Sequence, residues 1–247
     1  MGLQAYTMNE RPEKRALITA GCYWFVAFFL LPVFLLYLIN GFQNNESVLG
    51  WVQILYYFLN ALCSFFIFRE HLADGLFALR FDTKKVITTV LTCAGIFLVL
   101  LCGLLLLGTY VPALAWLGYL QNAVPVSELE WILMPTTLVQ VNPLFGTLSL
   151  VLFTPLTVSC LLYGLGFSPA CNVHPLLGYG VLLAVLALHR CLNYYSTGTI
   201  ELENMMFVIQ LPAHLLACVA YHRTESILAP ILFHMLINLL TCILILV

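Results

Sequence analysis

Residues Val86 to Val111 read VITTVLTCAGIFLVLLCGLLLLGTYV, an apolar run without a charged side chain. A helix over this run rises by roughly 39 Å at about 1.5 Å per residue, whereas the hydrocarbon core of a bilayer is about 30 Å thick. Uncharged apolar runs of about 18 residues or more are typical of helices that cross a membrane. The run therefore predicts a membrane-spanning helix.

The composition of the whole chain supports that interpretation. Of the 247 residues, 62% are hydrophobic and 8% are charged, whereas soluble domains carry about 25% charged residues. A soluble fold of this length needs more polar side chains to cover its surface. No basic run is longer than Lys84-Lys85, and nucleic-acid binding depends on clustered cations, so that class of function is excluded.

The cysteines indicate neither a disulfide framework nor a metal site. There are 9 of them, an odd number, and most stand singly inside apolar stretches. Neither a CxxC motif nor a Cys/His metal spacing occurs. We expect them to pack as small apolar residues, and we expect no metal and no cofactor.

Further apolar stretches have the length of a membrane span. The first begins after the polar residues Met1 to Arg15 and continues to about Leu38, which is too long for the core of a signal peptide. The others are Trp51 to Phe68, Val86 to Val111, Leu144 to Phe167, Leu176 to Asn193, Met205 to Tyr221 and Ser226 to Val247. The predicted fold is all-α, a polytopic bundle of about seven spanning helices in a single membrane domain, residues 1–247.

The stretch between Val111 and Leu144 is of a different kind. Its apolar pieces are short and are interrupted by proline, which breaks helices. We expect an interfacial or re-entrant segment here.

The distribution of cations predicts the orientation. With a cytoplasmic amino terminus, one side of the membrane holds Arg11, Lys14, Arg15, Arg69, Arg80, Lys84, Lys85 and Arg223. The opposite loops then carry Glu46, Glu128, Glu130, Glu201 and Glu203. Because Lys and Arg concentrate in cytoplasmic loops, we expect a cytoplasmic amino terminus, a carboxyl terminus outside, and a bacterial cytoplasmic membrane as the location.

Three histidines inside predicted spans are candidate functional residues, because ionisable side chains in a membrane are costly and usually face the bundle interior. His234 and Asn238 share one helical face. His189 lies at a similar depth in the inner half of the membrane, so we expect both imidazoles in one cavity, with His214 as an accessory. An isolated histidine can also serve only as an interhelical hydrogen-bond donor, and that alternative stays open.

The carboxyl-terminal stretch Tyr221 to Asn238, YHRTESILAPILFHMLIN, resembles the signature of the CPBP family. This family of membrane proteases includes the CAAX type II prenyl endopeptidase and bacteriocin-processing or immunity proteins. Its signature is a short basic turn, then a helix with Ser-Ile-x-x-Pro-Ile and HxxxN. Val185 to His189 resembles the family's FxxxH helix with valine for phenylalanine, and the similarity covers residues 78–247.

The family's first motif, EExxxR, is degenerate in this chain. Pro155 and Gly164 keep their register, but Val158 and Ser159 replace the two glutamates and Tyr163 replaces the arginine. The resemblance implies that His189, His234 and Asn238 are retained catalytic positions and that the glutamate acting as general base is missing. Loss of such a base typically lowers the rate by a factor of about 10² to 10⁴.

Other residues can in principle replace the missing base. Ser159 or Cys160 beside His189 would form a nucleophile and base pair. Glu201 and Glu203 follow the His189 helix, but the cation distribution places them on the far side of the membrane.

Three functions follow from these observations. The first is a catalytically impaired member of the family that binds or regulates a peptide or membrane-protein partner. The second is an active membrane-embedded peptidase that processes a carboxyl-terminal or leader peptide. The third is a small transporter, because histidines in a membrane can relay protons. Each implies contact with membrane lipid.

Overall fold

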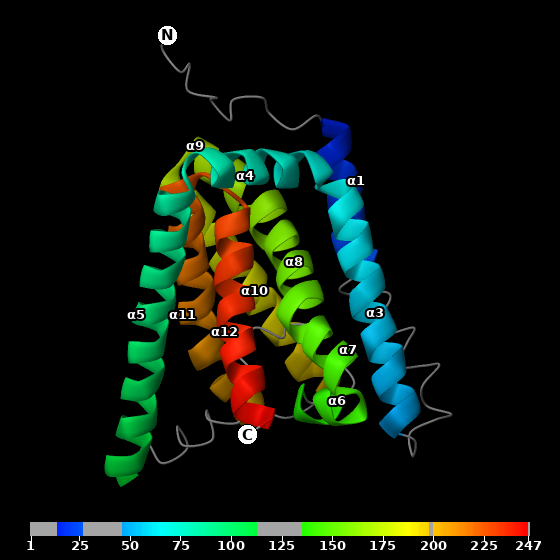
Figure 1. Cartoon of the computed structure of the whole chain (residues 1–247), viewed down its shortest axis with the longest axis vertical. Coiled ribbons are helices and arrows are strands. Elements are labelled where there is room, and N and C mark those ends of the chain that lie inside the picture. The colour runs from blue at the N-terminus through cyan, green and yellow to red at the C-terminus, as the bar shows by residue number, and fades with distance from the viewer. Residues whose placement is uncertain (1–13, 27–45, 113–134, 198–199, 247) are drawn as a thin grey trace.

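A computed structural model describes residues 14–26, 46–112, 135–197 and 200–246. Within these ranges the chain is helical, as predicted, and most helices run side by side as a bundle (Figure 1). The elements are α1 (Lys14–Phe25), α3 (Glu46–Ile67), α4 (Arg69–Phe81), α5 (Thr83–Tyr110), α6 (Pro135–Val141), α7 (Pro143–Leu148), η3 (Ser149–Phe153), α8 (Thr154–Ser159), η4 (Cys160–Phe167), α9 (Ser168–Val173), α10 (Pro175–Thr197), α11 (Ile200–Thr224) and α12 (Leu228–Leu246).

Three of the described helical stretches are long and apolar enough to cross a membrane. They are Ser47–Ile67, Thr83–Tyr110 and Pro143–Val173, and each overlaps a predicted span. Shorter apolar helices cover Pro175–Ala187 and Leu228–Ile243. The chain is therefore a multi-pass membrane protein by the length and composition of its helices. The predicted first span and the segment after Val111 lie partly outside the described residues.

The stretch from Pro143 to Val173 is one irregular helix through the centre of the bundle. Its parts η3 and η4 have π-helical geometry on either side of Pro155. Because proline has no N–H group, the carbonyl one turn before it loses its usual helical donor. The Ser149 carbonyl, earlier in the same stretch, accepts from both the backbone N–H and the hydroxyl of Thr154, the hydroxyl at 2.9 Å.

Helix α4 was not expected from the sequence. It lies across the end of the bundle, at a steep angle to the spanning helices (Figure 1). One side of it is buried through Phe68, Leu72 and Gly75. A Cβ atom at Gly75 would lie 3.0 Å from Leu228 Cγ, and the Ser226 hydroxyl donates to the Gly75 carbonyl at 3.4 Å. The absence of a side chain at position 75 therefore lets α4 pack closely on the start of α12.

A second close approach occurs at the corner between α6 and α7. The side-chain oxygen of Asn142 accepts a hydrogen bond from the Phe145 backbone N–H at 3.0 Å, which caps α7. At Gly146 an added Cβ would lie 2.5 Å from the Leu138 carbonyl oxygen and 2.9 Å from Val139 Cα. These are backbone atoms, so a rotamer change cannot make room for the new methyl group.

We therefore expect Gly146→Ala to lower the free energy of unfolding by about 1 to 3 kcal/mol, as for other overpacked positions. The measurement is titration of the purified protein with a denaturing detergent. Gly95→Ala is the matched control, since a Cβ there has no neighbour within 4 Å. Because alanine favours helix over glycine by about 1 kcal/mol, the control should be neutral or stabilising. Equal effects of the two substitutions would contradict the close packing of α6 on α7.

Candidate functional site

Four polar side chains meet in the interior of the bundle, and we call them the imidazole cluster: Ser159, Tyr163, His214 and His234. They come from three places, the central helix (α8 and η4), α11 and α12. All four have 0% exposure. The cluster is thus a buried polar group of residues from segments that are distant in the sequence.

The phenol of Tyr163 lies between the two imidazoles. Its hydroxyl oxygen is 2.7 Å from His214 Nδ1 and 3.4 Å from His234 Nε2. The Ser159 hydroxyl oxygen is 3.4 Å from His234 Nδ1. The two imidazole rings lie 5.3 Å apart between centroids, at 84° to one another. The contacts therefore form a chain from Ser159 through His234 and Tyr163 to His214.

Neutral side chains can satisfy this chain in either direction. In one direction Ser159 donates to His234 Nδ1, His234 Nε2–H donates to the Tyr163 oxygen, and Tyr163 donates to His214 Nδ1. In the other direction each donor becomes an acceptor, because an imidazole nitrogen and a hydroxyl can take both roles. A charged ring would be costly at this depth. The geometry thus suits a neutral hydrogen-bonded chain.

Asn238 makes its described hydrogen bond to the backbone. It follows His234 by one turn of α12, is fully buried, and donates from its amide nitrogen to the Leu150 carbonyl at 2.8 Å. Leu150 belongs to η3. Asn238 therefore links α12 to the irregular part of the central helix. It lies four residues after His234, which belongs to the imidazole cluster.

The positions that the resemblance aligns with EExxxR lie in or beside this cluster. Ser159 and Tyr163 contact His234 directly, while Val158 and Cys160 are adjacent in the sequence and fully buried. His214, expected as an accessory, makes the shortest contact of the cluster. The backbone of His189 belongs to α10, but its side chain is not among those described. Its place in a shared cavity stays a prediction.

Acidic groups are absent from the described interior. Among the described side chains, the buried polar ones are amides, hydroxyls and imidazoles, with no aspartate or glutamate. The same residues contain no group of three His, Cys, Asp or Glu side chains that could hold a metal ion. In the described part of the chain, hydrolysis therefore has no carboxylate base next to the imidazoles.

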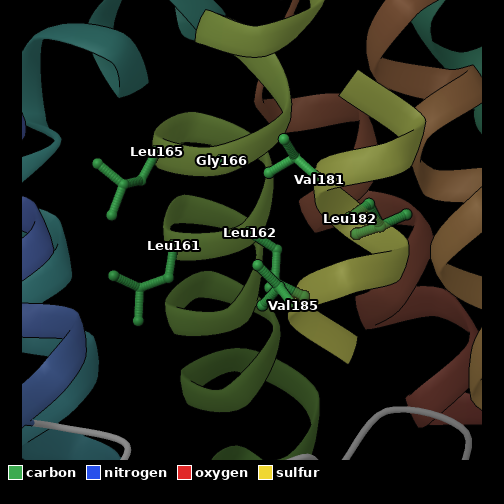
Figure 2. A pocket seen from close by; sticks show the side chains of 7 residues that line it. All are labelled: Leu161, Leu162, Leu165, Gly166, Val181, Leu182 and Val185. Atoms are coloured by element: carbon green, nitrogen blue, oxygen red, sulfur yellow. The ribbon is translucent and has the colours of Figure 1, made fainter. Parts of the chain in front are cut away.

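A cavity of about 110 Å³ lies between η4 and α10. Figure 2 shows its lining, which is entirely aliphatic apart from one glycine: Leu161, Leu162, Leu165, Gly166, Val181, Leu182 and Val185. None of these side chains can donate or accept a hydrogen bond. The cavity can thus hold an apolar group, but its side chains offer no hydrogen-bonding group to orient a peptide bond.

Comparison of the chain with protein-family models, with curated proteins and with solved structures finds no match. The resemblance to the CPBP family therefore depends on the motifs quoted above.

Tyr163→Phe tests the imidazole cluster. The change removes the hydroxyl and leaves buried nitrogens of His214 and His234 without that partner, so the free energy of unfolding should fall by about 1 to 3 kcal/mol. Detergent-induced unfolding of the purified protein measures it. Tyr110→Phe is the matched control, since Tyr110 is 78% exposed. If the two variants unfold alike, the tyrosine does not hold the cluster together.

Proposed function

We propose that this chain is a catalytically impaired membrane protein of the CPBP type, which binds a peptide or membrane-protein partner instead of cleaving it. The single observation that supports the loss of catalysis best is the place of Tyr163. Its hydroxyl lies within 2.7 and 3.4 Å of the two imidazoles. Of these two imidazoles, His234 is the one that the resemblance makes catalytic, and in a hydrolytic site its nitrogen would be needed for a water molecule or a developing oxyanion.

The other motif positions support the same proposal. Val158 stands where the resemblance predicts a glutamate, and a valine cannot accept a proton. All members of the imidazole cluster have 0% exposure, so a substrate would have to displace packed helices to reach them. The polar centre of the bundle is thus occupied by the protein's own side chains. A partner would therefore bind at the outer surface of the helices.

We further propose the topology expected from the sequence, with seven spans, a cytoplasmic amino terminus and a carboxyl terminus outside, in a bacterial inner membrane. The start of α1, the whole of α4, the start of α5 and the end of α11 lie at one end of the molecule (Figure 1). These segments carry Lys14, Arg15, Arg69, Arg80, Lys84, Lys85 and Arg223. One basic end agrees with the rule that cytoplasmic segments are rich in Lys and Arg.

A second candidate function, peptide hydrolysis, is favoured by one contact. The Ser159 oxygen lies 3.4 Å from His234 Nδ1, within reach for a nucleophile and its base. In such a reaction Ser159 would attack the peptide carbonyl, and its proton would pass to His234 and then to the leaving amine. Water would afterwards release the acyl group from the serine. The full burial of both residues makes this the weaker candidate.

A cleavage assay separates the two candidates. The protein is reconstituted in vesicles and incubated with a library of peptides carrying apolar carboxyl termini, and products are followed by mass spectrometry. We expect the wild-type protein and the Ser159→Ala variant to show the same background level of peptide cleavage. Wild-type cleavage that disappears in Ser159→Ala and in His234→Ala would overturn the impaired-member proposal in favour of the peptidase.

Restoring the motif tests the alignment with the family. The triple variant Val158→Glu, Ser159→Glu and Tyr163→Arg supplies two carboxylates and a guanidinium at the aligned positions, of which Ser159 and Tyr163 contact His234. If the positions correspond, the same assay should detect hydrolysis above that of the wild type. Ser159→Glu alone is the control, because it adds one acid without the paired arginine. A triple variant that folds and shows no gain would contradict the alignment.

Partner binding is tested with a photoactivatable residue on the lipid-facing side of the bundle. Leu91 and Val99 of α5 are exposed and suit this purpose, and buried Val90 is the control. In native membranes we expect a discrete crosslinked product when the photoactivatable residue stands at an exposed position. The same product should form when the protein also carries Ser159→Ala. Absence of any product from every exposed helix face would contradict the binding proposal.

A further inference from the structure

Exposed apolar and basic side chains stand together where α4 meets α5. We call this the corner surface, and its exposed members are Leu76, Phe77, Arg80, Phe81, Lys84 and Lys85. Neither the imidazole cluster nor the family motifs account for it. Large aromatic side chains exposed beside cations indicate a surface with an apolar, negatively charged partner.

The aromatic members are held in a fixed place. The Phe77 and Phe81 rings lie 4.4 Å apart between centroids, and their side chains are 60% and 66% exposed. The opposite face of α4 packs on the bundle through Leu72 and Gly75. Because that face packs on the bundle, the rings of Phe77 and Phe81 lie on the side of α4 that faces away from it.

The corner surface lies at the end of α5 where the exposed apolar face of that helix begins. Helix α5 has 28 residues and is roughly 42 Å long, which exceeds the hydrocarbon thickness of about 30 Å. Its exposed apolar face begins with Ile87 and Leu91, directly after Lys84 and Lys85. Helix α4 runs across this end of the bundle (Figure 1). The aromatic and basic side chains thus border the apolar belt of α5.

The cations of the corner surface are available to a partner. Within the part of the chain that the structure describes, Arg80, Lys84 and Lys85 are exposed and form no ion pair with an acidic side chain. Exposed Asp82 offsets one of these three charges. Arg223, also exposed, lies in the last turn of α11 on the same end of the molecule, and the exposed Glu225 that follows offsets its charge. The excess at this corner is positive and complements anionic headgroups.

We propose that the corner surface binds anionic phospholipids of the leaflet at this end of the protein. The rings of Phe77 and Phe81 enter the boundary between headgroups and acyl chains, as aromatic side chains of interfacial helices do. Arg80, Lys84 and Lys85 bind the phosphate groups. Helix α4 is then an interfacial anchor whose lipid preference comes from its basic end.

The experiment measures lipid retention by the full-length protein in detergent. Equal amounts of phosphatidylglycerol and phosphatidylcholine are added, and bound lipids are counted by native mass spectrometry. We expect the wild type to retain phosphatidylglycerol in excess. One basic residue near an anionic surface contributes a factor of about five in binding. Lys84→Gln should therefore lower the ratio of the two lipids about fivefold, and Arg80→Gln with Lys84→Gln and Lys85→Gln more than tenfold.

Arg69→Gln is the matched control, because Arg69 is an exposed cation at the opposite end of α4. Its lipid ratio should equal that of the wild type. Equal retention of the two lipids by the wild type, or an unchanged ratio in the triple variant, would overturn the proposal. So would a protein partner that crosslinks at Phe77 and is lost in Phe77→Ser while the lipid ratio is unchanged, since the corner would then be a protein interface.

Discussion

Hydrogen-bonding groups inside a bilayer have no water to pair with, so they must pair with one another, and the described interior of this protein follows from that constraint. The imidazole cluster joins the central helix to α11 and α12 through the phenol of Tyr163. The amide of Asn238 joins α12 to the irregular helix at Leu150. These contacts fix the relative rotation of helices whose apolar surfaces alone would allow many packings, because an unpaired polar group at this depth costs several kcal/mol.

The same constraint applies to the three positions that the resemblance aligns with EExxxR. Two glutamates and an arginine would carry charge into the centre of the membrane and would need one another. Here an apolar side chain, a hydroxyl and a phenol stand at those positions, and the two polar ones pair with neutral imidazoles. The uncharged residues at the three positions are mutually consistent, since a single charge introduced among them would be buried without an opposite charge. With these residues, the centre of the bundle is neutral and packed.

The long apolar helices could be predicted from the sequence because length and composition suffice for them. Helix α4 could not be predicted in this way, because its charged side chains mask the buried positions Phe68, Leu72 and Gly75. The intervals of four and three residues between these positions are the pattern that indicates the helix. For the histidines, position along a helix indicated depth but not rotation. The sequence makes His214 only an accessory, whereas in the structure it makes the shortest contact with Tyr163. The contact between Tyr163 and His214 joins residues 51 positions apart, so it depends on helix packing, which no local sequence pattern contains.

The length of α5 and the residues at its two ends relate this helix to the thickness of the surrounding bilayer. Lys84 and Lys85 favour the phosphate level at its start, and Tyr110, 78% exposed, ends it with a ring of the type that settles at a membrane interface. The rise from Lys85 to Tyr110 is roughly 37 Å at about 1.5 Å per residue. In a bilayer with a thinner core, this helix must lean or stretch the neighbouring lipids to satisfy both anchors, at a cost that grows with the mismatch. Membrane thickness therefore acts directly on the inclination of α5.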